Sequence, residues 1–321
     1  MDIFQILCND ILPLLFFIGA GYWLDGAFKL DLNTYNKLVI WIVLPCFMFF
    51  SMIQYHPQAK MIFIIPAFAL LLLLMAGISY ATSHFFAMDQ GKRSVFQAVS
   101  TYSNAGNIGI ALILFIYTHA PYVSGDQMPY LDDARGTIVM LMILMNIAVN
   151  LFGACQISHH RVTPLSFIRF VVKIPALYAV IAGLLVQYFQ ISLEHTFLWP
   201  VLHHFSGAFI VLVTIIVGAH LHRSKVRRPS KAVLFSSLQK LILTPCLAFL
   251  IITLFGSFTP TEAQVFFIAS AIPPSFTIVM YAAEYDNHSD FAAQSVLIST
   301  FLSIITLTAA IYLARILFPT V

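Results

Sequence analysis

Side chains that can bind a small molecule gather in Ser103–Gly109, a short polar stretch in the middle of a long apolar segment. Asn104 and Asn107 each offer hydrogen-bond donors and acceptors, and Gly106 and Gly109 permit the torsions that break a helix. In lipid, irregular backbone is tolerated only where protein or a water-filled cavity covers it. The stretch therefore indicates either a helix broken for a purpose or a small-residue packing face between helices.

A second interruption favours the broken helix. Phe266–Tyr281 reads FFIASAIPPSFTIVMY, an apolar segment that contains Pro273 and Pro274. Two consecutive prolines remove two backbone donors and clash with the preceding turn, so a straight helix cannot continue through them. Their fixed φ suits the first turn of a new helix, with Ser275 just inside it. A pair of interrupted segments in corresponding places of two halves indicates the binding site of a transporter.

If both helices break, two new helix N-termini form near Ile108–Ala111 and Pro274–Phe276. Each carries roughly half a positive charge and free N–H groups, which suits a carboxylate. The residues expected to bind such a ligand are Ser103, Asn104, Gly106, Asn107, Gly109, Pro273, Pro274, Ser275 and Lys240, with Thr277 as a lesser candidate. Alternatively, the two breaks pack against each other and bind no ligand.

Lys240 is the basic residue inside the expected span Val233–Phe255. A charge at that depth suggests a function, here a counter-charge for the substrate. A long side chain that reaches the membrane interface is the alternative. Four further polar residues are expected to cross-link helices or to line the cavity: Gln97, Asn146, Asn150 and Gln239.

Neither break carries an aspartate or a glutamate, which are the usual ligands for Na⁺ or carriers of a proton. This favours uniport, although Na⁺ held by neutral oxygens or a proton on His220 stays open. No metal or cofactor is expected, because the cysteines form no CxxC pair and no metal-ligand spacing. They are Cys8, Cys46, Cys155 and Cys246.

The composition indicates the class of protein. Of the 321 residues, 60% are hydrophobic and 9% are charged, and the mean hydropathy is +0.91. A soluble domain or a disordered chain does not have such a composition, so a multi-pass membrane protein in contact with the lipid bilayer is expected. The net charge of +3 indicates no nucleic-acid partner, because the basic residues lie in short loops between apolar runs.

A membrane-spanning helix needs roughly 20 apolar residues, which predicts about ten spans and an all-α fold. The expected spans are Ile3–Leu24, Tyr35–Ile53, Met61–Phe86, Val95–Tyr117, Gly136–Gln156, Phe167–Tyr188, Leu198–Leu221, Val233–Phe255, Ala263–Tyr281 and Phe291–Leu317. A division near Ser158–Thr163 leaves five spans in each half, so the two halves enter the membrane from opposite faces as inverted repeats. Each break then falls in the fourth span of its half.

Lys and Arg in short loops predict the orientation. With the N-terminus outside, the inner side collects Lys29, Lys37, Lys92, Arg93, Arg161, Arg169, Lys173, Arg223, Lys225, Arg227, Arg228 and Lys231. The outer side keeps Lys60, Arg135 and Arg315, together with an acidic loop that contains Asp126, Asp132 and Asp133. The expected location is the inner (plasma) membrane, with both termini outside.

Seven short motifs, in order along almost the whole chain, carry a resemblance to a known family. They are Ile11–Pro13 with Gly19–Tyr22, Val43–Pro45, Asn104–Gly109, Val217–Leu221, Ile272–Ser275, Tyr281–Tyr285 and Ser299–Leu307. The set resembles the auxin efflux carrier family in its compact bacterial form. Two positions depart from the family pattern, because Ala111 and the pair Ile210-Val211 stand where proline is usual.

The resemblance implies ten helices in two inverted five-helix repeats, with helices 4 and 9 broken and crossing at the substrate site, an architecture related to the bile acid:sodium symporters. It implies scaffold helices 1–2 (residues 1–56) and 6–7 (161–225), and transport-unit helices 3–5 (57–160) and 8–10 (226–321). Members of the family move small organic anions, and a homodimer through the scaffold helices is possible.

The expected function is therefore a secondary transporter for a small organic anion, a carboxylate, that works by alternating access. A membrane sensor of the same fold without turnover and a sodium-coupled symporter are the alternatives. An enzyme is not expected, because the pairs His159-His160 and His203-His204 lack the H-E-x-x-H spacing and a partner carboxylate.

Overall fold

The computed structural model describes residues 3–54, 63–125, 127–158, 175–224 and 228–320, and within them the chain is α-helical. The first part contains α1 (Ile3–Ile6), α2 (Leu12–Phe28), α3 (Leu32–Leu38), α4 (Leu44–Gln54), α5 (Ile64–Ser83), α6 (Gln90–Thr101), α7 (Ile110–Tyr117), α8 (Leu131–Ala148) and α9 (Ala154–Ser158). The second contains α11 (Pro175–Tyr188), α12 (Leu198–Arg223), α13 (Lys231–Leu238), α14 (Thr244–Phe255), α15 (Pro260–Ser270), α16 (Phe276–Glu284) and α17 (Ser289–Leu317).

Seven continuous helices among the described residues are long and apolar enough to cross a membrane. They are Ile3–Phe28, Leu32–Gln54, Ile64–Ser83, Leu131–Ser158, Leu198–Arg223, Lys231–Phe255 and Ser289–Leu317. The protein is therefore an all-helical, multi-pass membrane protein, as its composition predicts. Several predicted features lie outside the described residues: Lys60, Asp126, His159-His160, Arg161, Arg169, Lys173, Lys225, Arg227 and the unit boundaries near 56, 160 and 225.

The expected fourth and ninth spans are not single helices. The fourth consists of α6, a π-helical turn (Ala105–Gly109) and α7, and the ninth consists of α15 and α16. None of these pieces has the length of a membrane span. The expected sixth span, Phe167–Tyr188, is described only as α11. These three segments explain why seven continuous spans are found where the hydropathy pattern predicts about ten.

Several long helices contain a π-helical turn, and three of these turns lie just before a proline. The turns are Leu7–Ile11, Val39–Val43 and Gln239–Leu243, and the prolines are Pro13, Pro45 and Pro245. A proline ring clashes with the carbonyl four residues earlier in an α-helix. In each case the residue before the proline donates its N–H five residues back, for example Leu12 to Leu7, so the helix continues through a wider turn.

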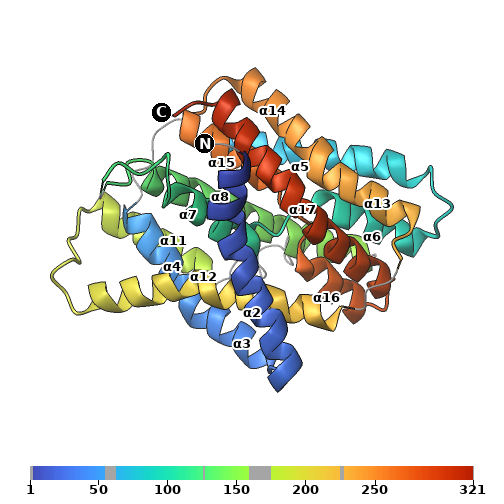
Figure 1. The fold of residues 1–321 in the computed structure, drawn as a ribbon, viewed down its shortest axis with the longest axis horizontal. Helices are drawn as coiled ribbons and strands as arrows, with labels where there is room; N and C mark the ends of the chain where they lie inside the picture. Colours follow the sequence, from blue (N-terminus) through green and yellow to red (C-terminus); the bar gives the residue numbers. More distant parts are fainter. Residues whose placement is uncertain (1–2, 55–62, 126, 159–174, 225–227, 321) are drawn as a thin grey trace.

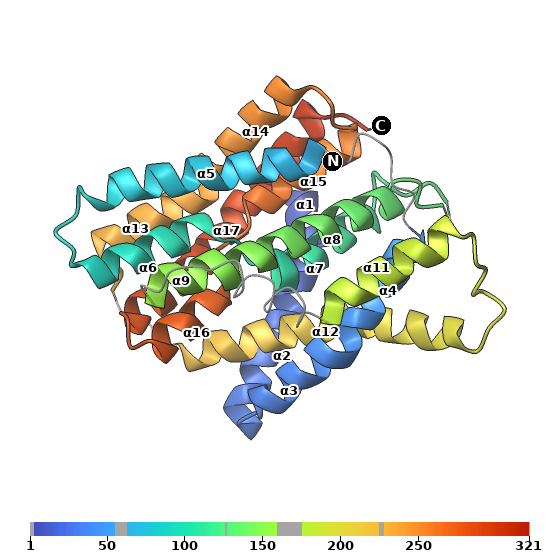
Figure 2. The same cartoon turned by 180° about the vertical axis from the view of Figure 1, so that it is seen from behind.

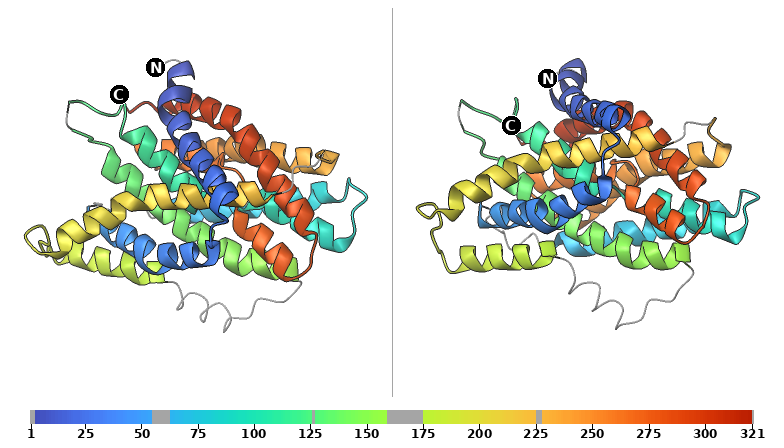
Figure 3. Two further views of the ribbon diagram at one scale, coloured as in Figure 1. Left: turned by 60° about the horizontal axis from the view of Figure 1, so that its bottom comes forward. Right: turned by 90° about the horizontal axis from the view of Figure 1, so that it is seen from below.

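One group of helices is held together by very close backbone contacts. The helices α2 and α12 cross in close contact, and α4 packs against α11 and α12 (Figures 1 and 3). A Cβ atom on Gly218 of α12 would lie 1.9 Å from the Ile18 carbonyl oxygen, and one on Gly21 would lie 2.2 Å from that of Ile215. Glycine is therefore required at both positions, because any side chain would push the helices apart.

The remaining helices form a second group, which carries both breaks. Here α5 packs against α6 and α14, α8 against α7 and α15, and α17 against α13, α15 and α16 (Figure 2). The N-terminus and the C-terminus lie at one end of the molecule, near α14 and α15, whereas α3 and α16 lie toward the opposite end (Figure 1).

Candidate functional site

The two broken segments meet and pair through their backbones. The Asn104 N–H donates to the Pro273 carbonyl at 2.9 Å, and the Ser275 N–H donates to the Tyr102 carbonyl at 3.0 Å. Ser103 and Pro274 lie opposite each other between these two hydrogen bonds, as in an antiparallel sheet. Backbone groups that the helix breaks leave without intrahelical partners are thus satisfied, as buried polar groups must be.

Each segment restarts as a helix that is capped by its own side chain. The Asn104 carboxamide oxygen accepts the Asn107 N–H at 3.4 Å, and the Ser275 hydroxyl accepts the Thr277 N–H at 3.3 Å. Asn and Ser are favoured at this position because their short side chains reach the first free N–H groups. Two helix N-termini therefore lie beside the crossing. The second begins at Phe276, as predicted, whereas the first begins at Ala105, before the predicted Ile108–Ala111, because Asn104 caps it.

A cavity of about 470 Å³ lies against this crossing. Its wall comes from the crossing itself, from α3 and the turn after it, from α8, from α12 and from α16. The polar side chains on this wall belong to Asn33, Asn36, Lys37, Ser103, Asn104, Asn107, Asn146, Asn150, His220, Ser275, Thr277, Tyr281 and Glu284. The volume lies in the range of ordinary small-molecule sites.

Carboxamides dominate this wall. The chain has eight asparagines, and six of them line the cavity. Asn150 accepts the Tyr281 hydroxyl at 2.5 Å and donates to the Asn146 carbonyl at 2.7 Å. The half-buried Asn107 carboxamide forms no hydrogen bond with the described residues, so its donors and acceptor are available to a ligand.

The charged residues on the wall are few. Among the described residues that line the cavity, the one basic side chain with a permanent charge is Lys37, and the one carboxylate is Glu284. Lys37 follows Asp31, which accepts the N–H groups of Asn33 and Thr34 as the N-cap of α3. The Thr34 hydroxyl and N–H donate to this carboxylate and hold the pKa of Asp31 below its ordinary value of 3.8. The cap thus positions Asn33, Asn36 and Lys37.

Sequence reasoning missed these three α3 residues as site residues. It assigned Lys37 to an inner loop and did not single out Asn33 or Asn36. The polar run directly before an apolar span was the available signal, but only the packing of α3 beside the crossing places it at a cavity.

The structure brings together most of the residues predicted to bind a ligand. Ser103, Asn104, Gly106, Asn107 and Ser275 line the cavity. The remaining residues of the two segments shape the crossing: Gly109, Pro273 and Pro274. A Cβ on Gly109 would lie 2.8 Å from the Ile272 side chain, so glycine lets the two broken segments approach closely.

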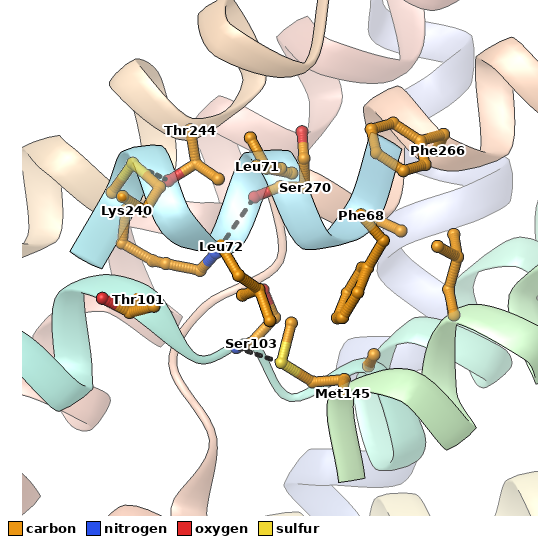
Figure 4. Close-up of a pocket in the computed structure, with 14 residues that line it drawn as sticks. Phe68, Leu71, Leu72, Thr101, Ser103, Met145, Lys240, Thr244, Phe266 and Ser270 are labelled. Atoms are coloured by element: carbon orange, nitrogen blue, oxygen red, sulfur yellow. Dashed lines mark hydrogen bonds between the residues drawn. The ribbon is translucent and has the colours of Figure 1, made fainter. Parts of the chain in front are cut away.

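Lys240 lies behind the crossing and does not line the large cavity (Figure 4). Its side chain is 1% exposed, and its Nζ donates to the Ser270 carbonyl at 3.2 Å. It borders a separate, small space of about 20 Å³ together with Thr101, Ser103 and Thr244. The ammonium group therefore does not reach the membrane interface. Because Ser103 also lines the large cavity, the fourth-helix segment separates Lys240 from it.

The other intramembrane polar residues connect helices or line the cavity, as expected. Gln97 donates to Ser83 and accepts from Gln156, and Gln239 donates to Thr82. His220 stacks on Phe276 with ring centroids 3.9 Å apart. This stack joins α12 to the first turn of α16 at the cavity wall.

The fold and the cavity define a multi-pass, helical membrane protein with a cavity at the meeting point of two broken helices. The sequence profile of the membrane transport protein family matches residues 6–155 and 158–311. The chain belongs to this family, which is that of the auxin efflux carriers, so the resemblance in the sequence motifs is confirmed. No curated protein matches the chain. Members of the family are membrane transporters rather than enzymes.

Proposed function

We propose that the protein is a secondary transporter that moves a small organic anion, a carboxylate, by alternating access. The substrate binds in the cavity between the broken fourth and ninth helices. The observation that carries this proposal is the meeting of two helix N-termini at the wall of a cavity of about 470 Å³.

The chemistry of the wall suits an anion. Helix N-termini present N–H groups and partial positive charge, and both N-termini here begin at residues that line the cavity. Asn104 and Asn107 supply carboxamides, with Ser103, Ser275 and Thr277 as hydroxyl partners. Lys37 adds a full positive charge on the α3 side, where it attracts the substrate to the cavity.

Lys240 contributes from behind the crossing. Its ammonium group lies beside Ser103 and Ser270, in a part of the protein with little water to screen it. A positive charge at this position favours an anion on the other side of the thin fourth-helix segment. Because it touches the backbone of α15 and not the large cavity, its role is electrostatic.

Ten helices in two inverted repeats are supported by reciprocal packing. The first helix of the chain packs on the seventh (α2 on α12), and the sixth packs on the second (α11 on α4). At the crossing, each broken segment donates one N–H to the other. Both relations are those that a two-fold axis between two five-helix halves produces.

The same contacts support two moving units. The close glycine contacts unite the scaffold helices 1–2 and 6–7, and the breaks belong to helices 3–5 and 8–10, the transport unit. Transport then requires the second unit to move against the first. A homodimer through the scaffold helices is part of the proposal.

The proposed orientation places both termini outside the inner (plasma) membrane. With this orientation, the described lysines and arginines of the short loops divide between an inner side with Lys29, Lys37, Lys92, Arg93, Arg223, Arg228 and Lys231 and an outer side with Arg135 and Arg315. The cavity is lined by α3 and by α16, which lie toward the end of the molecule opposite both termini. The site is therefore proposed to face the cytoplasm in this state.

A thermal-shift screen of the purified protein against organic acids, with and without Na⁺, tests the proposal. A ligand that binds only the folded state raises its stability by RT ln(1 + [L]/Kd). We expect a carboxylate to stabilise the wild-type protein and an Asn9→Ala control, but not Asn107→Ala. Asn9 is a matched control because it is an exposed asparagine outside the cavity. Stabilisation only by cations or neutral molecules would contradict the anion site.

Counterflow in proteoliposomes separates the carrier from its alternatives. A carrier preloaded with unlabelled substrate accumulates labelled substrate transiently, whereas a sensor binds the acid without moving it. A dependence of uptake on Na⁺ would identify the sodium-coupled symporter.

A further inference from the structure

An ion pair joins the first helix of the chain to the last. Arg315 of α17 approaches Asp10 of the turn Leu7–Ile11, with 3.0 Å between Nη2 and Oδ2. The Asp10 side chain is fully buried, and that of Arg315 is 12% exposed. The second carboxylate oxygen, Asp10 Oδ1, is also buried and accepts no hydrogen bond from the described residues. The carboxylate is thus only half satisfied in this state.

Arg315 is held firmly on its own side of the pair. Its guanidinium lies over the Tyr122 ring, 5.2 Å from the centroid. The Tyr122 and Tyr117 hydroxyls both donate to Gln264 Oε1, at 2.7 and 2.8 Å, and Gln264 donates to the Phe318 carbonyl at 2.6 Å. These residues belong to α7 and the loop after it, to α15 and to the chain end after α17. Among these neighbours of Arg315, Asp10 is the residue that belongs to the first helix of the chain.

The ion pair and the cavity lie toward opposite ends of the molecule. The 17 residues of α2, about 25 Å of helix, run from the Asp10 turn toward α3, which lines the cavity. Figure 1 shows both termini at one end and α3 and α16 toward the other. Near Asp10 the first helix contacts α7 and α17, whereas farther along it contacts α12.

We propose that the Asp10–Arg315 ion pair is a latch that closes the side of the substrate path opposite the cavity mouth, and that it separates when the site turns to that side. This inference rests on the proposed function. A carrier whose site is open on one side must be closed on the other. The pair lies between the first helix and elements of the other unit, on the side that must be closed.

The environment of the pair suits a contact that forms and breaks. Burial of two charges is costly and is repaid only when both are well paired. Because Asp10 Oδ1 accepts no hydrogen bond within the described part of the chain, admission of water would restore its hydration and offset much of the lost attraction. The Tyr122 ring keeps Arg315 in place for the pair to form again. The closed and open states thus remain close in free energy, as a switch requires.

Two reporter cysteines test the latch in a background in which Cys8, Cys46, Cys155 and Cys246 are replaced. Leu14→Cys lies one turn beyond Asp10 and is a buried position, with 3% of Leu14 exposed. Met280→Cys lies on the cavity wall, where Met280 is 52% exposed. The rate of reaction with a hydrophilic maleimide is measured in detergent for each reporter. We expect Asp10→Asn to raise the Leu14→Cys rate about tenfold and to lower the Met280→Cys rate, because the population shifts between the two states.

The control and the second variant use the same reporters. Asp132→Asn removes the ion pair between Asp132 and Arg135, which lies within α8 near the same end, and should change neither rate. Arg315→Gln breaks the same ion pair at its more exposed partner. It should change both reaction rates in the same directions as Asp10→Asn, and it replaces Asp10→Asn in the test if Asp10→Asn does not fold. Unchanged rates in the folded variant, or a rise at both reporters from local loosening, would overturn the latch. Because no substrate is present, failure of the latch is distinguishable from failure of transport.

Discussion

Ser275 donates its backbone N–H to the carbonyl of Tyr102 at 3.0 Å, and this hydrogen bond joins the two halves of the chain at their breaks. Tyr102 is the first residue after α6, and Ser275 is the residue that caps α16. The same contact that satisfies the backbone therefore places a new helix N-terminus beside the cavity. A short paired segment is a stiff support for such a site, because each half holds the other.

The tight crossing of α2 and α12 predicts a strong effect of a single methyl group. Gly218→Ala would place Cβ 1.9 Å from the backbone oxygen of Ile18, which cannot move away as a side chain can. We expect destabilisation of about 3 kcal/mol or more in thermal or denaturant unfolding. Gly19→Ala is the matched control on α2, since no atom lies within 4 Å of its added Cβ. Equal stability of the two variants would show that the helices do not cross so closely.

Lys37 is expected to act on the arrival of the substrate rather than on its movement. Lys37→Gln should raise the KM for an anion about two- to fivefold with little change in maximal rate, because exposed charges contribute modestly. The effect should shrink at high salt, where the charge is screened. Lys29→Gln removes a cation that does not line the cavity and serves as the control. An equal change in both variants would mean that only net charge matters.

The substitution Lys240→Met distinguishes a structural role of Lys240 from a functional one. Lys240→Met removes the buried charge and keeps most of the side-chain volume, and such replacements are often neutral or stabilising. We expect a thermal midpoint at least equal to that of the wild type, together with a loss of transport of about tenfold or more. Full transport by a stable Lys240→Met variant would remove Lys240 from the proposed mechanism.

The cap of α3 predicts a dependence of stability on pH. The pKa of Asp31 is lowered in the folded protein, so the charged cap stabilises the fold above the ordinary pKa and this contribution is lost as the pH falls through the folded value. The thermal midpoint of Asp31→Ala should therefore lie below that of the wild type at neutral pH. The difference should shrink below about pH 4. A difference that is constant down to pH 3 would show that the carboxylate charge does not contribute.

The sequence predicts the two breaks because local chemistry decides them. Gly106 and Gly109 weaken a helix and Asn104 can cap a new one, while Pro273 and Pro274 cannot continue an α-helix. These breaks divide the fourth and ninth apolar segments into shorter helices, so the structure has fewer continuous spans than the sequence has apolar segments. Helix existence and type follow from hydropathy over many residues, so these features need no tertiary information.

The rest of the site depends on packing between distant segments. Asn33, Asn36 and Lys37 belong to a polar helix start that resembles an ordinary loop until α3 lies beside the crossing. Asp10 and Arg315 are 305 positions apart, so no local pattern in the sequence indicates that they pair. The sequence predicts that Lys240 lies within the membrane. It does not predict that Lys240 lies on the side of the crossing away from the large cavity.

Transport by Asn107→Ala tests the central claim most directly. Counterflow of an organic acid that stabilises the wild-type protein is measured in proteoliposomes that contain equal amounts of folded wild-type protein, Asn107→Ala or Asn9→Ala. We expect full counterflow for the wild type and Asn9→Ala, and none above background for Asn107→Ala, because the Asn107 carboxamide lines the cavity and forms no hydrogen bond with the described residues. Wild-type counterflow by folded Asn107→Ala would contradict a substrate site at the crossing of the broken helices.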